Sequence, residues 1–235
     1  MPDAPEPSLA AQEFRAGLRD ITPLSFGVAV YGLAFGLLAA GQGMGALATG
    51  LMGATVFAGS AQIVAVERLA AGSGAVLAVI AGLALNLRIL LMTASLRREL
   101  SDRPLWQVVL GVHLTSDENW VLMHATRTKG RAAGYWYLVG GGVSLIAVWV
   151  ASTALGAGFA RALPDLGASG MDFAFAAAFI LLLTSLWQGR RSLSPWIVSA
   201  GVAAGCVLVL PVDPSWGLIA GAVAGAGVAG LRRDG

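Results

Sequence analysis

The sequence predicts an all-α protein that spans a membrane several times. The chain of 235 residues is 57% hydrophobic and 12% charged, whereas a soluble domain normally carries about 25% charged residues. Asp, Glu, Lys, Arg and His are absent from five long stretches, residues 21–66, 132–160, 173–189, 192–212 and 214–231. Apolar runs of about 18 residues or more are typical of transmembrane helices. We therefore expect a polytopic helix bundle in a lipid bilayer.

Six apolar segments predict helices that cross the bilayer: residues 21–40, 74–96, 133–156, 172–189, 193–210 and 214–231. Two further segments are irregular. Residues 46–70 are apolar but interrupted by Phe57–Gln62, and residues 104–126 contain His113, Asp117, Glu118, Asn119 and His124. Non-helical backbone at membrane depth is tolerated only where protein or water satisfies its polar groups. The two irregular segments therefore indicate a cavity in the first half of the chain, and residues from 132 onward are interpreted as scaffold.

The basic residues favour one topology over another. They form five clusters: Arg15 with Arg19, Arg97–Arg103, Arg127–Arg131, Arg190–Arg191 and Arg232–Arg233. All five lie on the cytoplasmic side if the six clear helices cross and the two irregular segments enter and leave from one face. Eight full crossings, the alternative, would place Arg97–Arg103 outside. Both topologies put both termini in the cytoplasm, with residues 1–20 as an N-terminal arm, 21–231 as a single transmembrane transporter domain and 232–235 as a tail.

Composition and motifs argue against several classes of function. The net charge of +2 does not indicate nucleic-acid binding, because the basic residues lie between apolar runs rather than on one face. No phosphate-binding glycine loop, nucleophile elbow or zinc-protease motif is present. His113 and His124 lack a third ligand at metal-binding spacing. We therefore expect no enzyme activity, no metal and no cofactor.

Arg88 is the one charged residue in the apolar stretch 69–96. A helix through this stretch places it about nine residues, roughly 13 Å, from the Arg97–Arg98 pair. Burying a cation at that depth costs between about 2.5 and 10 kcal/mol, so such residues usually face a bundle interior or a watery cavity. Arg88 is therefore a candidate functional residue, with a structural ion pair between two helices as the alternative.

Residues 58–62 offer a place to break a helix. Gly59 and Ser60 favour the break, and Gln62 adds a hydrogen-bond donor and acceptor. A half-helix that begins near Ser60 would direct free N–H groups and a positive dipole end into the membrane interior, which suits a carboxylate. The alternative is an unbroken helix that uses Gly, Ala and Ser as a packing surface.

Two more groups of polar residues belong to the candidate site. Asn86 lies about 200° around a helix from Arg88, so the two do not share one face. Asp117 and Glu118 are adjacent carboxylates that could pair with Arg88 or exchange protons; the alternative is a solvated loop at the interface. The candidate substrate-binding residues are Gly59, Ser60, Gln62, Asn86 and Arg88, and the candidate coupling or ion-pair residues are Asp117 and Glu118.

These motifs resemble those of the AzlC family of branched-chain amino acid permeases. The similar segments, in family order and spacing, are Gly17–Pro23, Phe57–Gln62, Asn86–Arg88, Ser95–Arg97 and Ser116–Glu118 with Trp120. There are departures: Ile89 replaces the family's His after the Arg, Leu91 or Met92 replaces a nearby Tyr, and Ser116 replaces a Thr. The loss of His and Tyr removes polar groups beside Arg88, which bears on substrate choice.

The resemblance implies an inner-membrane exporter of branched-chain or similar neutral amino acids that works with a small hydrophobic partner of the AzlD type. The residues agree with this expectation, because a zwitterion needs a cation or N–H cluster, an anion and an apolar pocket. Proton coupling through Asp117 or Glu118 is a further expectation. The alternatives are an ion channel or pore and a non-transporting membrane accessory subunit.

Overall fold

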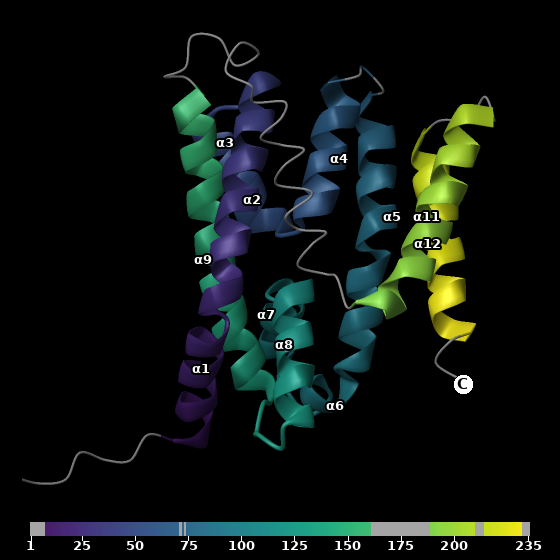
Figure 1. Ribbon diagram of the computed structural model, residues 1–235. Helices are drawn as coiled ribbons and strands as arrows, with labels where there is room; N and C mark the ends of the chain where they lie inside the picture. The colour runs from purple at the N-terminus through teal and green to yellow at the C-terminus, as the bar shows by residue number, and fades with distance from the viewer. Residues whose placement is uncertain (1–7, 71, 73, 161–188, 210–213, 232–235) are drawn as a thin grey trace, which may run out of the picture. The chain divides into compact units, whose positions relative to one another are not determined.

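The computed structural model describes residues 8–70, 72, 74–160, 189–209 and 214–231, and all regular secondary structure within these residues is helical (Figure 1). The chain divides into two compact units, Met1–Leu181 and Leu182–Gly235. The first unit contains α1 (Leu9–Asp20), α2 (Thr22–Gly41), α3 (Ala46–Val56), α4 (Gly59–Ala70), α5 (Gly74–Ser95), α6 (Arg97–Leu100), α7 (Leu105–His113), α8 (Asp117–Thr128) and α9 (Tyr135–Ala160). The second contains α11 (Arg190–Val209) and α12 (Pro214–Leu231).

Five of the six predicted spans correspond to helices of the structure. They are α2, α5, α9, α11 and α12, whereas the predicted span 172–189 lies almost entirely outside the described residues. Among the residues that the structure describes, α2 and α9 are each long and apolar enough to cross a membrane, and α3 and parts of α11 and α12 form shorter apolar helices.

The α2 helix packs along α9, and small residues allow this contact. A Cβ atom on Gly36 would lie 2.2 Å from the Thr153 carbonyl oxygen, and one on Gly156 would lie 2.3 Å from the Leu33 carbonyl oxygen. Both distances are shorter than any real contact, so the two backbones approach to a separation that only glycine permits. Such close approach is characteristic of helices that pack in membranes.

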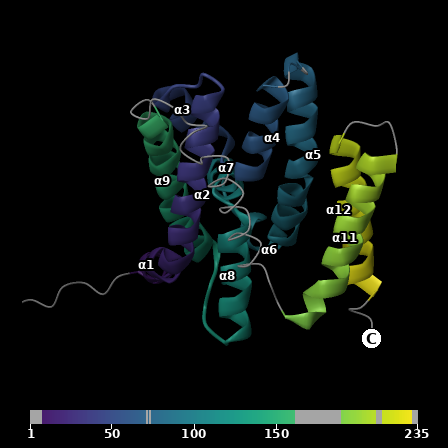
Figure 2. The same ribbon diagram turned by 45° about the horizontal axis from the view of Figure 1, so that its top comes forward.

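Each of the two irregular segments is a helix broken in its middle. The α3 helix ends at Val56, Phe57 adopts the left-handed conformation with φ of 41°, and α4 begins at Gly59. The second segment breaks between α7 and α8, at residues 114–116. Figures 1 and 2 show each pair folding back on itself, with α3 and α4 at one end of the unit and α7 and α8 at the other.

The two turns meet in the middle of the first unit. His113, the last residue of α7, places its Nε2 3.0 Å from the Ala54 carbonyl oxygen in the last turn of α3. The His113 ring also packs against the Phe57 ring, with 6.4 Å between centroids. The last carbonyl groups of a helix have no partner within the helix, so this contact satisfies one of them and joins the two breaks.

The first three basic clusters lie together at one end of the first unit, which we call the basic end. An ion pair of 2.9 Å joins Arg131 to Asp20 at the end of α1, and one of 2.6 Å joins Arg127 to Glu99 of α6. The Tyr137 hydroxyl also donates to Asp20, over 3.2 Å. These contacts bring α1, α6 and the segment between α8 and α9 to the same end.

The second unit is an antiparallel pair of helices. Gly217, Gly221 and Gly225 follow one another at intervals of four on α12 and face α11. A Cβ on Gly221 would lie 2.5 Å from the Ser199 carbonyl oxygen. Small residues at this spacing are a helix-packing signal of membrane proteins.

Candidate functional site

Arg88 of α5 contacts both broken segments. Its Nη1 lies 2.8 Å from Asp117 Oδ2 at the start of α8, and its Nη2 donates to Ser60 Oγ at the start of α4, over 2.9 Å. The Arg88 side chain is 47% exposed and that of Asp117 is 37% exposed. The structure thus brings one residue from each predicted motif together, and the ion pair stays accessible to a ligand.

The Arg88 guanidinium lies beside the first turns of two half-helices. Ser60 is the second residue of α4 and Asp117 is the first residue of α8. The first N–H groups of a helix have no partner within the helix and carry the positive end of its dipole. The Asp117 carboxylate stabilises the Arg88 guanidinium beside these two positive helix ends. If Asp117 were displaced, the cation and the N–H groups would together attract another anion.

The two half-helices present similar side chains in the same order. Ser60 and Asp117 turn toward α5, and the residues two positions later, Gln62 and Asn119, turn toward α9. Two residues correspond to about 200° around a helix, so each half-helix contacts α5 and α9 with opposite faces. Gln62 Oε1 accepts from Trp149 Nε1 over 3.0 Å, and Asn119 Nδ2 donates to the Leu138 carbonyl oxygen over 3.2 Å.

The other predicted site residues lie around this centre without the same contacts. Gln62 is completely buried and faces α9 rather than Arg88, and its Nε2 has no hydrogen-bond partner in the described part of the chain. Asn86 is half-buried, and its Oδ1 likewise has no partner there. Glu118 is half-buried directly after Asp117, and the Arg88 ion pair described above is with Asp117.

Gly59 lies against an aromatic wall formed by Tyr31 and Trp149. A Cβ on Gly59 would be 2.9 Å from Tyr31 Cε1 and 2.9 Å from Trp149 Cη2, so the break requires glycine here. The two rings contact each other at 5.5 Å between centroids, and Phe35 stacks on Trp149 at 5.8 Å.

Trp149 was not among the residues predicted for the site, because residues from 132 onward were interpreted as scaffold. The signal was present, since Trp149 is the one tryptophan in the middle of a predicted span. The other six lie near the ends of predicted spans, where an aromatic belt belongs.

The two histidines of the second irregular segment contact other protein groups. No group of three or more His, Cys, Asp and Glu side chains among the described residues could hold a metal ion. His113 instead contacts the Ala54 carbonyl, and His124 packs edge-on against Trp120 with 4.5 Å between ring centroids.

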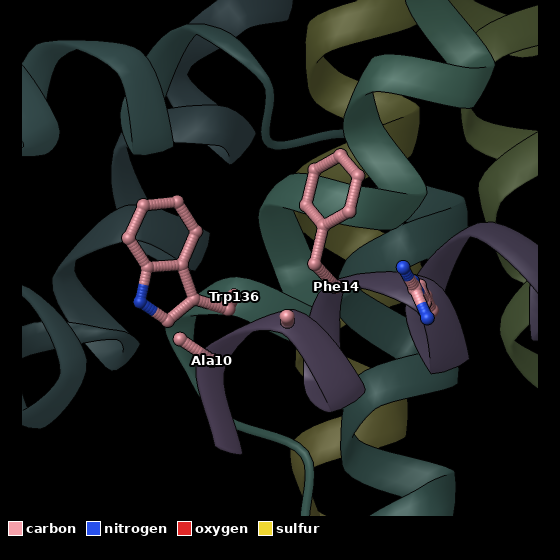
Figure 3. Close-up of a pocket in the computed structure, with 5 residues that line it drawn as sticks. Ala10, Phe14 and Trp136 are labelled. Atoms are coloured by element: carbon pink, nitrogen blue, oxygen red, sulfur yellow. The ribbon is translucent and has the colours of Figure 1, made fainter. Parts of the chain in front are cut away.

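Two cavities lie at the basic end and not at Arg88. One, of about 230 Å³, is apolar and lies between α1 and the first turn of α9, where Ala10, Phe14 and Trp136 line it (Figure 3). The other, of about 480 Å³, is polar and includes Glu99, Arg103 and Arg127 in its lining. Arg103 lies over the Tyr135 ring in this cavity, 3.9 Å from its centroid.

A helix bundle in which two broken helices meet at a polar centre has the architecture of a membrane transport protein. The chain belongs to the AzlC protein family, which matches residues 23–163. The matched region contains all three motifs of the candidate site. This match confirms the resemblance seen in the sequence. AzlC proteins are components of branched-chain amino acid transporters and not enzymes.

A relative in Escherichia coli strain K12 supports the assignment. The chain is 28% identical over 231 residues to a protein described as inner membrane protein YgaZ, and the match covers 92% of this chain and 91% of that protein. No solved structure gives a significant match. The chain is therefore a helical membrane protein of the AzlC family.

Proposed function

We propose that the protein is a secondary transporter that exports branched-chain or similar neutral amino acids across the cytoplasmic membrane. The observation that carries this proposal is the position of Arg88, which contacts the beginnings of both half-helices through Ser60 and Asp117. An ion pair made only to join two helices needs no helix breaks around it. A binding site for a zwitterion needs both charges and free N–H groups at one place.

Binding would proceed by exchange of carboxylates at Arg88. The substrate carboxylate takes the place of Asp117 on the guanidinium and accepts further hydrogen bonds from the N–H groups at Gly59 and Ser60. Asp117, with Glu118 beside it, then faces the substrate ammonium group. The apolar substrate side chain packs on the surrounding helices, and Asn86 and Gln62 add polar groups to the site. This exchange keeps every charge paired throughout, which a low-dielectric site requires.

Proton coupling follows from the same exchange. When no substrate is bound, Asp117 is neutralised by Arg88. When the substrate carboxylate occupies Arg88, Asp117 is released from the guanidinium, and a proton can neutralise it in place of the substrate ammonium group. Asp117, together with Glu118, is therefore the proposed coupling site.

The proposed topology has six full crossings and two segments that enter and leave from the same face, within one transporter domain of residues 21–231. The basic end faces the cytoplasm, because Lys and Arg are enriched on that side of membrane proteins. Both termini are then cytoplasmic. The location is the inner membrane, as the description of the Escherichia coli relative supports. The proposed partner is a small hydrophobic membrane subunit of the AzlD type.

Efflux measurements test this function. Cells preloaded with labelled leucine, isoleucine, valine or methionine should lose at least one of them faster when they contain the chain and its partner subunit. Arg88→Gln should abolish the difference although the variant is still found in the membrane. Equal efflux with and without the chain would remove the substrate assignment, and current without saturation by amino acids would indicate a channel.

A double variant separates a binding role of Arg88 from a structural one. Arg88→Gln leaves Asp117 unpaired, which reduces stability, and adding Asp117→Asn removes the unpaired charge. We expect Arg88→Gln/Asp117→Asn to regain wild-type stability and still not transport. Transport by the double variant would show that the pair only joins helices, as in an accessory subunit.

A further inference from the structure

The hydrogen bond between Trp149 and Gln62 lies in the interior of the first unit. Trp149 is 3% exposed and Gln62 is 0% exposed. The indole Nε1 donates to Gln62 Oε1 over 3.0 Å, and the indole ring is held by Tyr31 on one side and Phe35 on another. Three helices are involved, because Gln62 belongs to α4, Trp149 to α9, and Tyr31 and Phe35 to α2. Packing against Tyr31 and Phe35 thus holds the indole ring in place independently of its hydrogen bond to the amide.

The indole determines which way the Gln62 amide points. An indole N–H can only donate, so it must meet the amide oxygen and not the amide nitrogen. Nε2, with its two N–H donors, is then directed away from Trp149, and it is buried with no partner among the described residues. An unpaired buried donor is costly, so a native structure that keeps one calls for a functional explanation.

The Gln62 amide lies beside the break between α3 and α4. The Trp149 ring borders glycines on both sides of this break: Nε1 lies 3.4 Å from the position of a Cβ on Gly53, and Cη2 lies 2.9 Å from that on Gly59. Side chains of a helix lean toward its beginning, so the amide of Gln62 lies alongside the first turn of α4. The N–H groups of that turn are donors as well, and a group of donors alone suits an acceptor such as a carboxylate.

Asn119 is the amide residue at the corresponding place on α8, and its hydrogen bonding differs from that of Gln62. Asn119 Nδ2 donates to the carbonyl oxygens of Leu114 and Leu138 over 2.7 and 3.2 Å, and its Oδ1 accepts from the Ser116 backbone N–H over 2.8 Å. Both ends of this amide have partners, so it joins α8 to α9. Gln62 has a partner at one end only, although it occupies the corresponding place on α4.

We propose that Trp149 is a positioning residue of the substrate site. Its indole N–H orients the Gln62 amide so that Nε2 donates to the carboxylate of the transported amino acid at the start of α4. Trp149 touches no substrate and acts through Gln62. This inference rests on the proposed function, since the ligand of Nε2 is the amino acid that the protein transports.

The test is a double-mutant cycle on apparent affinity. Trp149→Phe keeps an aromatic ring against Tyr31 and Phe35 and removes the donor, and Gln62→Met keeps the length of the side chain and removes the amide. The probe is whichever of leucine, isoleucine, valine and methionine gives the fastest wild-type efflux. Each single variant should raise the apparent KM about tenfold, the effect of losing one hydrogen bond to a charged group. The maximal rate should stay the same, and the double variant should match the single ones.

Trp120→Phe is the matched control. It also removes an indole hydrogen bond, which Trp120 Nε1 makes to Ser95 Oγ over 2.9 Å, and it should leave the apparent KM unchanged. Any of three results would overturn the positioning role and leave the proposal of amino-acid export intact. These results are a wild-type KM in Trp149→Phe, effects that multiply in the double variant, and an effect of Trp120→Phe equal to that of Trp149→Phe. Absence of saturable efflux from the wild type would remove the proposed function, and this inference with it.

Discussion

Charged residues of the first unit are concentrated in two kinds of place. Arg88 with Asp117 lies where the two broken helices meet, and the remaining ion pairs described here lie at the basic end. We propose different tasks for the two places. At the basic end, water and lipid headgroups can solvate the charges, so those pairs hold elements together. At Arg88 the apolar surroundings make every unpaired charge costly, so a change of partner there can be linked to transport.

Asp20 illustrates the structural kind of carboxylate. Burial raises the pKa of Asp20, but hydrogen bonds from Arg131 and Tyr137 outweigh this effect, so the pKa lies below its ordinary value of 3.8. A lowered pKa means that folding stabilises the ionised form of the carboxyl group relative to its protonated form. The contribution of Asp20 to stability is therefore present above its ordinary pKa and is lost as the pH falls through the lowered value.

We expect Asp20→Asn to destabilise the protein at pH 7 by about 1 kcal/mol, because Arg131 and Tyr137 lose a charged acceptor. The variant should also lose less stability than the wild type when the pH is lowered from 5 to 3. Thermal unfolding in detergent at a series of pH values measures both effects. Identical pH profiles of variant and wild type would show that the Asp20 contacts do not contribute.

At the scale of elements, both helix breaks depend on contacts with other helices. The α3–α4 break needs the left-handed Phe57 and the bare backbone of Gly59, and its turn is closed by His113 from the other broken segment. The α8 helix begins with a cap in which Asn119 accepts from the Ser116 backbone. Neither half-helix is long enough to be stable alone, so tertiary contacts support both.

Gly59→Ala tests the packing at the first break. The added methyl group would collide with the rings of Tyr31 and Trp149, and overpacking of this kind costs about 1 to 3 kcal/mol. We expect a lower midpoint of thermal unfolding and slower transport. Gly158→Ala is the control, because nothing lies within 4 Å of its Cβ position and alanine favours a helix. If both variants unfold at the same temperature, the aromatic wall is not packed against Gly59.

At the scale of the whole molecule, we expect the fold-back of each broken helix to set the membrane topology. The α3–α4 pair leaves the end of α2 and returns to the start of α5 at the same end of the first unit (Figure 1). The α7–α8 pair does the same at the basic end. We propose that the connections around residues 42 and 72 lie on one side of the membrane, and those around residues 102 and 129 on the other.

Cysteine accessibility measures this arrangement. In a Cys206→Ser background, Gln42→Cys and Ser73→Cys should both react in intact cells with a thiol reagent that does not cross the membrane. Lys129→Cys should react only after the membrane is permeabilised. Eight full crossings predict a different result, in which Ser73→Cys is protected while Gln42→Cys reacts.

Much of this protein could be predicted from the sequence, because the relevant constraints are local. A bilayer of about 30 Å requires long apolar runs, so the positions of α2, α5, α9, α11 and α12 follow from the absence of charge. Gly59 and Ser60 indicated the first break, and the depth of Arg88 indicated a polar partner. Each of these conclusions depends on residues close together in the chain.

The tertiary structure alone decided which groups meet. Asp117 rather than Glu118 pairs with Arg88 because α8 begins at Asp117 and directs that side chain toward α5. Gln62 faces Trp149 because it lies two residues beyond Ser60, on the opposite side of α4. The meeting of His113 with Ala54 joins residues far apart in the sequence. These contacts depend on how helices pack through space, and apolar periodicity and charge spacing do not encode which face of one helix meets which face of another.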